Sequence, residues 1–436
     1  MAASVAPAPQ FDPSTSDAAR AGAAAYLQSR LKPSSSPSTT QKQQQPFTIP
    51  TIDLGPSFGN DAAARLAVAR QMHAACTSSG FFTITNHGIA PGVIAGVLRQ
   101  AKRFFHELDA AKRERLHMRN SALHRGYEPP AYTSIDGSAE TKAGFNWGYE
   151  ERLRPASFEG TYDGGYVELD GKKYEGGSGN LWPAEEDLPG FFEGVKEYYG
   201  EAMGLARHLM GLFGLALGLG EGWFDSAMTH PGGIARLLYY PPGKPVEEEQ
   251  QKEQDIGLGA HSDYECFTIL LPSGTPGLEV LSPAGQWTQV ERVDGGLIVN
   301  IADFLMRWTN DMYKSTVHRV VNRTREPRYS VPLFFSVNYD QVVEVRPKHR
   351  NPPTPKPPKR EKETQRGRIG GKRMTQLLTC RTAQTLPSCI SPDNPPKYGP
   401  IRAGEYVLER LNTSTKGGKG SYGNQDWADG DEGAKK

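Results

Sequence analysis

The stretch His261-Ser-Asp-Tyr-Glu-Cys-Phe-Thr-Ile-Leu270 places two candidate metal ligands directly before a β-rich run. His261 and Asp263 are two positions apart, so on a strand both side chains would lie on the same face. A third candidate ligand, His318, opens another β-rich run, His-Arg-Val-Val321. Two imidazoles and one carboxylate suit one ferrous ion and leave three coordination positions open.

A later β-rich run contains a second pair of polar residues two positions apart. Arg328 and Ser330 open the run Arg-Tyr-Ser-Val-Pro-Leu-Phe-Phe335, so both should point to one face. An inward arginine in an apolar barrel needs an anion, because an unpaired buried guanidinium is very costly. An isolated His-x-Asp is weak evidence of a metal site, but the added His and Arg-x-Ser favour one beside a small dicarboxylate.

The second half of the chain reads as many short strands separated by Gly/Pro turns. This pattern predicts a mainly β fold with flanking helices, built as a sandwich or open barrel. The helical segment Glu185–Leu219 should pack on the outside of the β-core. The expected strands are Ala235–Tyr240, Phe267–Leu271, Leu278–Leu281, Trp287–Val290, Leu297–Ile301, Arg319–Asn322 and Tyr329–Asn338.

The region before this β-core should be α+β. Ordered structure is expected from Phe47, with helices over 61–78 and 91–108 and a buried strand over 80–86. Residues 125–180 are rich in Gly and Tyr with little periodicity, which indicates a loop-rich lid or a substrate-facing segment.

Composition narrows the class of protein. The 436 residues are 37% hydrophobic and 23% charged with a formal charge of +1, so no basic field calls for nucleic acid or a membrane surface. No apolar stretch reaches the length of a membrane span. The four cysteines form no CxxC pair, which is typical of a reduced, cytoplasmic protein. A transit peptide carrying Arg20 and Arg30 stays open, and a monomer is expected.

Blocks on both sides of the candidate ligands resemble the isopenicillin N synthase-like Fe(II)/2-oxoglutarate-dependent dioxygenases. The resemblance spans roughly 47–345 and resumes at 386–411. It is carried by Ile49-Pro-Thr-Ile-Asp-Leu54, Gly80-Phe-Phe82, Asn86-His-Gly88, His261–Leu270, Gly277-Leu-Glu-Val280, Gly285-Gln-Trp287, Val299-Asn-Ile-Ala-Asp303, Arg307-Trp-Thr-Asn310, Lys314–Val320 and Arg328–Phe335.

The resemblance implies a double-stranded β-helix (jelly-roll) core. It implies that the ligands of Fe(II) are His261, Asp263 and His318. It also implies that 2-oxoglutarate is held by Arg328, Ser330 and Tyr240, although Leu238 stands where many members have Asn.

The implied reaction consumes dioxygen and 2-oxoglutarate, releases succinate and carbon dioxide, and hydroxylates or desaturates a small-molecule substrate. Ascorbate is the expected reductant. One alternative is an isopenicillin N synthase-like oxidase that does not use 2-oxoglutarate. Another is a non-catalytic binding protein that keeps the fold. Aromatic side chains that either line the substrate cavity or belong to the core are Phe145, Trp147, Tyr149 and Phe334.

The chain is expected to divide into five parts. These are an N-terminal extension, disordered or partly helical (1–46), an α+β region (47–180), the catalytic β-helix with its packing helix (181–345 and 386–411), a basic Pro-rich insertion (346–385) and a disordered tail (412–436). The insertion has three readings: a disordered surface loop, a basic targeting or nucleic-acid patch, and a translated intron.

Overall fold

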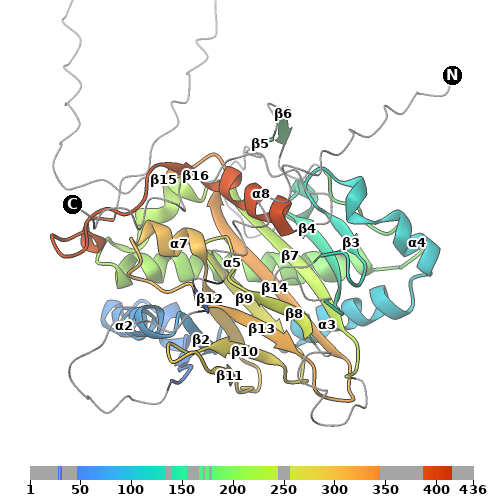
Figure 1. Ribbon diagram of the computed structural model, residues 1–436, viewed down its shortest axis with the longest axis horizontal. Coiled ribbons are helices and arrows are strands. Elements are labelled where there is room, and N and C mark those ends of the chain that lie inside the picture. Colours follow the sequence, from blue (N-terminus) through green and yellow to red (C-terminus); the bar gives the residue numbers. More distant parts are fainter. Residues whose placement is uncertain are drawn as a thin grey trace, which may run out of the picture.

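A computed structural model describes residues 28, 30–31, 47–133, 140–154, 166–169, 172–175, 179–243, 256–343 and 386–414 (Figure 1). The predicted insertion at 346–385, and nearly all of the predicted extension and tail, lie outside the described residues. Among the described residues, no helix is long and apolar enough to cross a membrane.

A large, mostly antiparallel sheet of eight strands forms one layer of the molecule. Its central strands are β14 (Arg328–Asn338) and its two neighbours, β7 (Pro231–Tyr240) and β9 (Phe267–Pro272). Across the sheet the order is β1 (Thr51–Asp53), β2 (Phe81–Thr85), β12 (Leu297–Ile301), β9, β14, β7, β4 (Ala143–Gly148) and β3 (Gly126–Glu128).

A smaller sheet of four strands faces the large one. Its order is β11 (Trp287–Gln289), β10 (Leu278–Leu281), β13 (His318–Val321) and β8 (Ile256–His261). Apolar side chains from both sheets meet in one buried cluster, where Leu238 and Ile298 of the large sheet join Leu258 and Val320 of the small one. Two antiparallel sheets packed over a shared core form the predicted jelly-roll.

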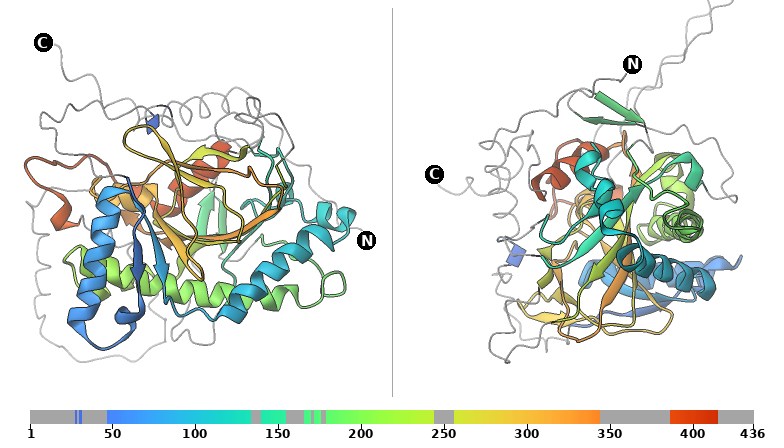
Figure 2. Two further views of the ribbon diagram at one scale, coloured as in Figure 1. Left: turned by 90° about the horizontal axis from the view of Figure 1, so that it is seen from below. Right: turned by 90° about the vertical axis from the view of Figure 1, so that its right-hand side faces the viewer.

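Helices cover the outer face of the large sheet. The longest, α5 (Phe191–Ala216), runs beneath the sheets and is flanked by α2 (Ala62–Ser78) and α3 (Pro91–His106) (Figure 2). The rings of Phe213 in α5 and Phe267 in β9 have centroids 5.3 Å apart, so the helix packs directly on the sheet. The helix begins at Phe191 rather than the predicted Glu185, because Gly190 adopts a left-handed conformation with φ of 71°.

The shorter elements connect and close the structure. Further α-helices in the described part of the chain are α4 (Ala110–Arg115), α7 (Asp303–Trp308) and α8 (Ala403–Ser414). The 3₁₀ helices there are η1 (Gly55–Phe58), η2 (Met118–Asn120), η3 (Glu151–Leu153), η4 (Glu221–Ala227) and η5 (Pro387–Cys389). Two small strand pairs complete the list: β5 (Tyr166–Leu169) with β6 (Lys172–Glu175), and β15 (Val342–Val343) with β16 (Ile401–Arg402).

The interval 125–180 contains more regular structure than its sequence predicts. Strands β3 and β4 lie in it and extend the large sheet beyond β7. All six residues of β4 are buried, so the strand shows no alternation of apolar and polar residues. A strand covered on both faces lacks the periodic signal on which the loop prediction relied.

The chain returns to the core on both sides of the predicted insertion. Val343 and Leu386 are both buried in the main hydrophobic cluster, and β15 pairs with β16. Deleting 346–385 is therefore expected to leave the melting temperature within about 4 °C of the full chain, since shortening a long connection changes its closure free energy only slightly.

The matched control for this deletion removes residues 386–414, which carry Leu386, β16 and α8. That truncation should lower the melting temperature strongly, because it removes buried side chains from the core. A large loss of stability in the 346–385 deletion, comparable with the control, would contradict this expectation. Thermal unfolding followed by circular dichroism measures both.

Candidate active site

The three predicted metal ligands come together between the two sheets. His261 ends β8 and lies directly opposite His318, the first residue of β13. Asp263 lies two residues beyond the end of β8, so it reaches the site from a turn and not from a strand position. Its Oδ1 atom is 3.5 Å from His261 Nε2 and 3.6 Å from His318 Nε2. The three ligand atoms lie within 4.8 Å of one another, and all three residues are buried.

The imidazoles are oriented by their other nitrogen atoms. His261 Nδ1 is 2.8 Å from the carbonyl oxygen of Gly259, and His318 Nδ1 is 3.1 Å from that of Thr316. A carbonyl only accepts hydrogen bonds, so each Nδ1 carries a hydrogen, and in the neutral imidazole each Nε2 then presents a lone pair. Two lone pairs and one carboxylate oxygen thus face a common point, an arrangement that a divalent cation satisfies.

The second carboxylate oxygen of Asp263 is held by two donors. Asn300 Nδ2 donates to Oδ2 at 2.7 Å, and the Thr268 hydroxyl donates to the same atom. Burial raises the pKa of Asp263, but His318 and His261 outweigh it and hold that pKa well below its usual range. Burial, with help from His261, lowers the pKa of His318 to about 4. The carboxylate is therefore charged and this imidazole neutral, as metal ligation requires.

Replacing Asn300 with alanine is expected to weaken Fe(II) binding by about 10- to 100-fold, because Asp263 loses the donor that fixes its orientation. Equilibrium titration of the metal measures the effect. Asn322→Ala is the matched control, because Asn322 is equally buried but donates to the carbonyls of Pro241 and Glu326. Equal losses of affinity in the two variants would contradict a role for Asn300 at the metal.

The predicted anion-binding residues lie beside this triad. Arg328 and Ser330 of β14 and Tyr240 of β7 line one cavity together with His261, Asp263 and His318; we call it the first cavity. Arg328 pairs with Tyr240 in the sheet register, and its guanidinium carbon is 4.8 Å from the Tyr240 ring centroid. The small residue Gly257 allows this packing, since a Cβ there would lie 2.5 Å from Tyr240 Cδ1.

Arg328 is a buried cation without an anion. Its side chain is 1% exposed, its Nε has no hydrogen-bond partner, and Nη1 is 3.4 Å from Ser330 Oγ. Within the described residues it makes no ion pair with a carboxylate, and burial lowers its pKa. Because an uncompensated buried guanidinium is costly, the site fits a bound carboxylate.

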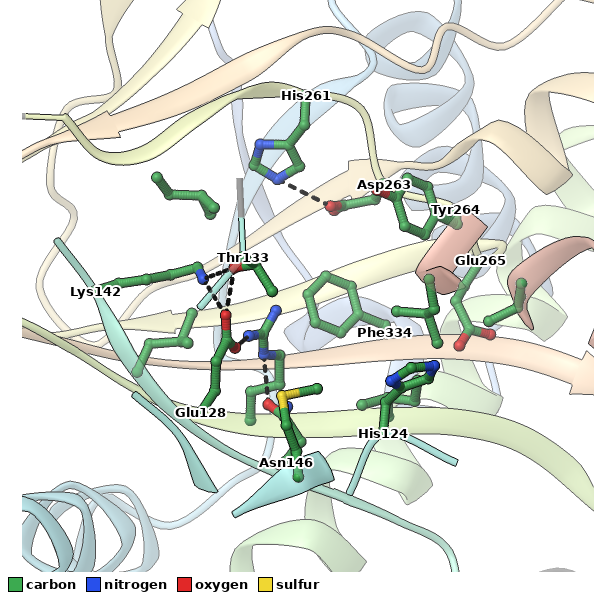
Figure 3. Close-up of a pocket in the computed structure, with 17 residues that line it drawn as sticks. His124, Glu128, Thr133, Lys142, Asn146, His261, Asp263, Tyr264, Glu265 and Phe334 are labelled. Carbon is green, nitrogen blue, oxygen red and sulfur yellow. Dashed lines mark hydrogen bonds and ion pairs between the residues drawn. The ribbon is translucent and has the colours of Figure 1, made fainter. Parts of the chain in front are cut away.

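A second cavity opens on the other side of the triad (Figure 3). It shares His261, Asp263, Leu238, Leu258 and Phe334 with the first cavity, so the candidate metal site lies where the two meet. The predicted Phe334 lines both cavities, whereas Phe145, Trp147 and Tyr149 do not line them and pack in or against the main core.

One wall of the second cavity is charged, which the sequence did not predict. Glu128 of β3 is fully buried and accepts hydrogen bonds from Lys142 and from Arg236 of β7. Lys142 also lies 3.1 Å from Glu140. Burial raises the pKa of Glu128, but the two cations lower it to about 2. The visible signal was an acid in β3 and a base in β7, with a second base, Lys142, directly before β4.

Glu265 lines the opposite end of the second cavity in Figure 3. Burial raises its pKa to about 7, which indicates that neighbouring donors and cations do not fully compensate its charge. Nothing in the stretch His261–Leu270 marks this residue as functional, so its position in the cavity could not be predicted from the sequence.

Asp303 ties the metal-binding turn to the C-terminal helix. Its backbone N–H donates to the carbonyl of Asp263 at 2.9 Å, and its carboxylate accepts from Ser262 Oγ at 3.1 Å. Tyr406 of α8 donates to the same carboxylate at 3.3 Å, and Arg410 lies 3.7 Å from it. Two further α8 residues line the second cavity, namely Val407 and Leu411. Helix α8 is thus fixed as part of the cavity wall.

Comparisons with known proteins agree with this geometry. The profile of the 2OG-Fe(II) oxygenase superfamily matches residues 231–337, and that of the non-haem dioxygenase N-terminal region, described from morphine synthesis, matches 49–163. The 2-oxoglutarate-Fe(II) type oxidoreductase hxnY of Emericella nidulans is 36% identical over 311 residues, covering 69% of this chain and 83% of the relative. The chain belongs to the 2OG-Fe(II) oxygenases.

Other similar proteins include two from fungi. Clavatol oxidase claD of Penicillium crustosum is 33% identical over 312 residues, covering 68% of this chain and 88% of that one. The crystal structure of a full-length Neurospora crassa protein in complex with alpha-KG and thymine has a TM-score of 0.63 at 24% identity, covering 84% and 97% of the two chains, and supports the fold.

These findings confirm several predictions. The oxygenase is an oxidoreductase of the Fe(II)- and 2-oxoglutarate-dependent class, and its β-rich core with flanking helices agrees with the jelly-roll. Its cofactors are Fe(II) and 2-oxoglutarate, and its substrate is a small molecule. The alternative of an oxidase that works without 2-oxoglutarate is not favoured.

Proposed function

We propose that this oxygenase holds Fe(II) through His261, Asp263 and His318 and uses it to hydroxylate or desaturate a small organic molecule. The observation that carries the proposal is the convergence of two Nε2 lone pairs on one carboxylate oxygen. The bound iron, with 2-oxoglutarate and dioxygen, supplies the oxidising chemistry and yields succinate and carbon dioxide.

Arg328 and Ser330 hold the far carboxylate of 2-oxoglutarate in this proposal, with Tyr240 beside them. A guanidinium fork matches a carboxylate with two parallel hydrogen bonds, and the serine hydroxyl adds a third donor. The buried, unpaired Arg328 supports this role, because the cosubstrate would supply the missing negative charge. The cosubstrate is thereby anchored in the same cavity as the metal ligands.

The substrate binds in the second cavity, on the other side of the triad. Its wall combines an apolar surface, including Phe334, with the charged cluster of Glu128, Lys142 and Arg236. An enclosed site of this kind suits a compact molecule with a few polar groups. The names of two similar proteins, a clavatol oxidase and a structure holding thymine, support a compact ring compound.

We also propose that the enzyme is a cytoplasmic monomer that uses ascorbate as a reductant and binds neither nucleic acid nor a membrane. The near-zero formal charge of +1 supports the absence of a nucleic-acid partner.

The function is tested by incubating the purified full chain with Fe(II), 2-oxoglutarate, oxygen and ascorbate while a library of small aromatic and heterocyclic compounds is screened. The expected result is succinate formation that rises with a substrate and with an oxidised product in equal amount. Before the screen, the anaerobic Fe(II)–2-oxoglutarate complex is followed by its charge-transfer absorption. Failure to form that complex at all would overturn the proposal.

A further inference from the structure

One described piece of the N-terminal extension packs against the small sheet. Leu31 is partly buried and contacts a cluster formed by Ala260 of β8, Leu281 of β10 and Val317. Ala260 and Val317 directly precede the two histidines of the triad. Because side chains alternate along a strand, Ala260 points away from the metal site when His261 points into it. Leu31 therefore lies behind the strand ends that carry both histidines.

The residue before it, Arg30, approaches the support of the third ligand. Its Nη1 atom is 3.8 Å from Asp303 Oδ1 and donates to the sulfur of Met306 at 3.5 Å. Asp303 binds the metal-binding turn at two points, because its N–H donates to the Asp263 carbonyl and its carboxylate accepts from Ser262 Oγ. One residue thus separates Arg30 from the backbone of the carboxylate ligand.

The Asp303 carboxylate depends on cations from both ends of the described chain. It is 1% exposed, and the hydroxyls of Ser262 and Ser315 donate to it at 3.1 Å and 2.6 Å. Arg410 of α8 lies 3.7 Å from this carboxylate, and Arg30 lies 3.8 Å from it. A buried carboxylate is costly unless cations and donors surround it. Loss of either arginine should therefore loosen the position of Asp303.

We propose that Arg30 and Leu31 are positioning residues that hold the metal-binding triad in place from behind. The inference rests on the proposed function, because it presupposes Fe(II) at the triad. Leu31 supports the strand ends that carry His261 and His318, while Arg30 supports the turn through Asp303. Neither Arg30 nor Leu31 lines the two cavities, so neither contacts the metal, the cosubstrate or the substrate.

The test uses the full chain and measures Fe(II) affinity by anaerobic titration without 2-oxoglutarate. Arg30→Gln and Leu31→Ala are each expected to weaken binding by about 10-fold, the low end of the range for residues that orient a metal ligand. Arg30→Lys should retain most of the affinity, because it keeps a cation near Asp303. Leu31→Met should also retain it, because the side-chain volume is nearly unchanged.

Co(II) provides a second measurement, because its visible absorption changes with the arrangement of its ligands. Arg30→Gln and Leu31→Ala should shift these bands relative to the wild type. The matched control is Arg103→Gln on α3. Arg103 is 21% exposed against 20% for Arg30, pairs with Glu107 at 3.0 Å, and lines neither cavity. This control should keep the wild-type affinity and bands. Thermal unfolding of the metal-free proteins shows that each variant is folded.

The inference is overturned if Arg30→Gln and Leu31→Ala bind Fe(II) as tightly as the wild type and leave the Co(II) bands unchanged. It is also overturned if Arg103→Gln weakens binding to the same extent, since the effect would then reflect general stability. A wild-type protein that binds no Fe(II) contradicts the earlier proposal of the metal site instead.

Discussion

Replacing His318 with alanine is expected to weaken Fe(II) binding by more than about 100-fold and to abolish succinate formation. Even a residue that only orients a ligand contributes about 10- to 100-fold in metal affinity, so loss of a ligand atom should cost more. Within the described residues, His261, Asp263 and His318 form the one group of side chains that could hold a metal ion. No other side chain is therefore placed to replace His318 as a ligand. Metal titration and cosubstrate turnover measure the two effects.

The matched control is His208→Ala. His208 lies on α5, stacks on Phe58 with ring centroids 4.4 Å apart, and lines neither cavity of the site. This variant should bind iron and turn over 2-oxoglutarate like the wild type. If His318→Ala kept wild-type metal affinity, the assignment of the triad would be wrong, whatever the overall activity.

The metal site could be predicted from the sequence because this combination of residue types and spacings is uncommon. A His-x-Asp pair, a later His and an Arg-x-Ser each begin or precede a β-rich run, and antiparallel pairing then brings such strand ends together. The spacing of the ligands does not predict how Asp263 reaches the site. Asp263 lies in the turn after β8, so its approach to the histidines depends on the turn geometry and on Asp303, which binds its backbone.

Strand β8 itself was not predicted, although it carries His261. Its sequence, Ile256-Gly-Leu-Gly-Ala-His261, contains two glycines, which lower β-propensity. The structure explains one of them, because any side chain at Gly257 would collide with Tyr240. The glycine at 257 leaves room for the Tyr240 ring in the cavity wall. This requirement arises from the packing of the two sheets against each other, so it cannot be predicted from the local sequence.

The charged wall of the second cavity was hidden for a different reason. Glu128 and Arg236 are 108 positions apart, and nothing in either local sequence points to the other. Their pairing follows from the order β7-β4-β3 at the edge of the large sheet. Local sequence patterns predict strands and turns, but this cluster forms only through the pairing of distant strands. The wall of the proposed substrate cavity therefore could not be predicted from the sequence.

Replacing Arg328 with methionine should weaken 2-oxoglutarate binding by about 100-fold or more, since two charge-assisted hydrogen bonds are lost at once. The same change should leave the unfolding free energy of the cosubstrate-free protein equal or higher, because it removes a buried cation that has no anion partner. Ser330→Ala should cost roughly 10-fold, the effect of one hydroxyl donor. Cosubstrate titration and chemical denaturation measure these quantities separately.

The matched control is Arg319→Met on the neighbouring sheet. Arg319 pairs with Glu279 at 2.8 Å and lies 4.1 Å from the Trp287 ring centroid, so its loss should lower stability without changing 2-oxoglutarate affinity. The two substitutions are thus expected to change the unfolding free energy differently. This difference distinguishes an arginine that binds a ligand from one that stabilises the fold. Should Arg328→Met bind 2-oxoglutarate within about threefold of wild type, the cosubstrate carboxylate must bind elsewhere, and the unpaired guanidinium would need another anion.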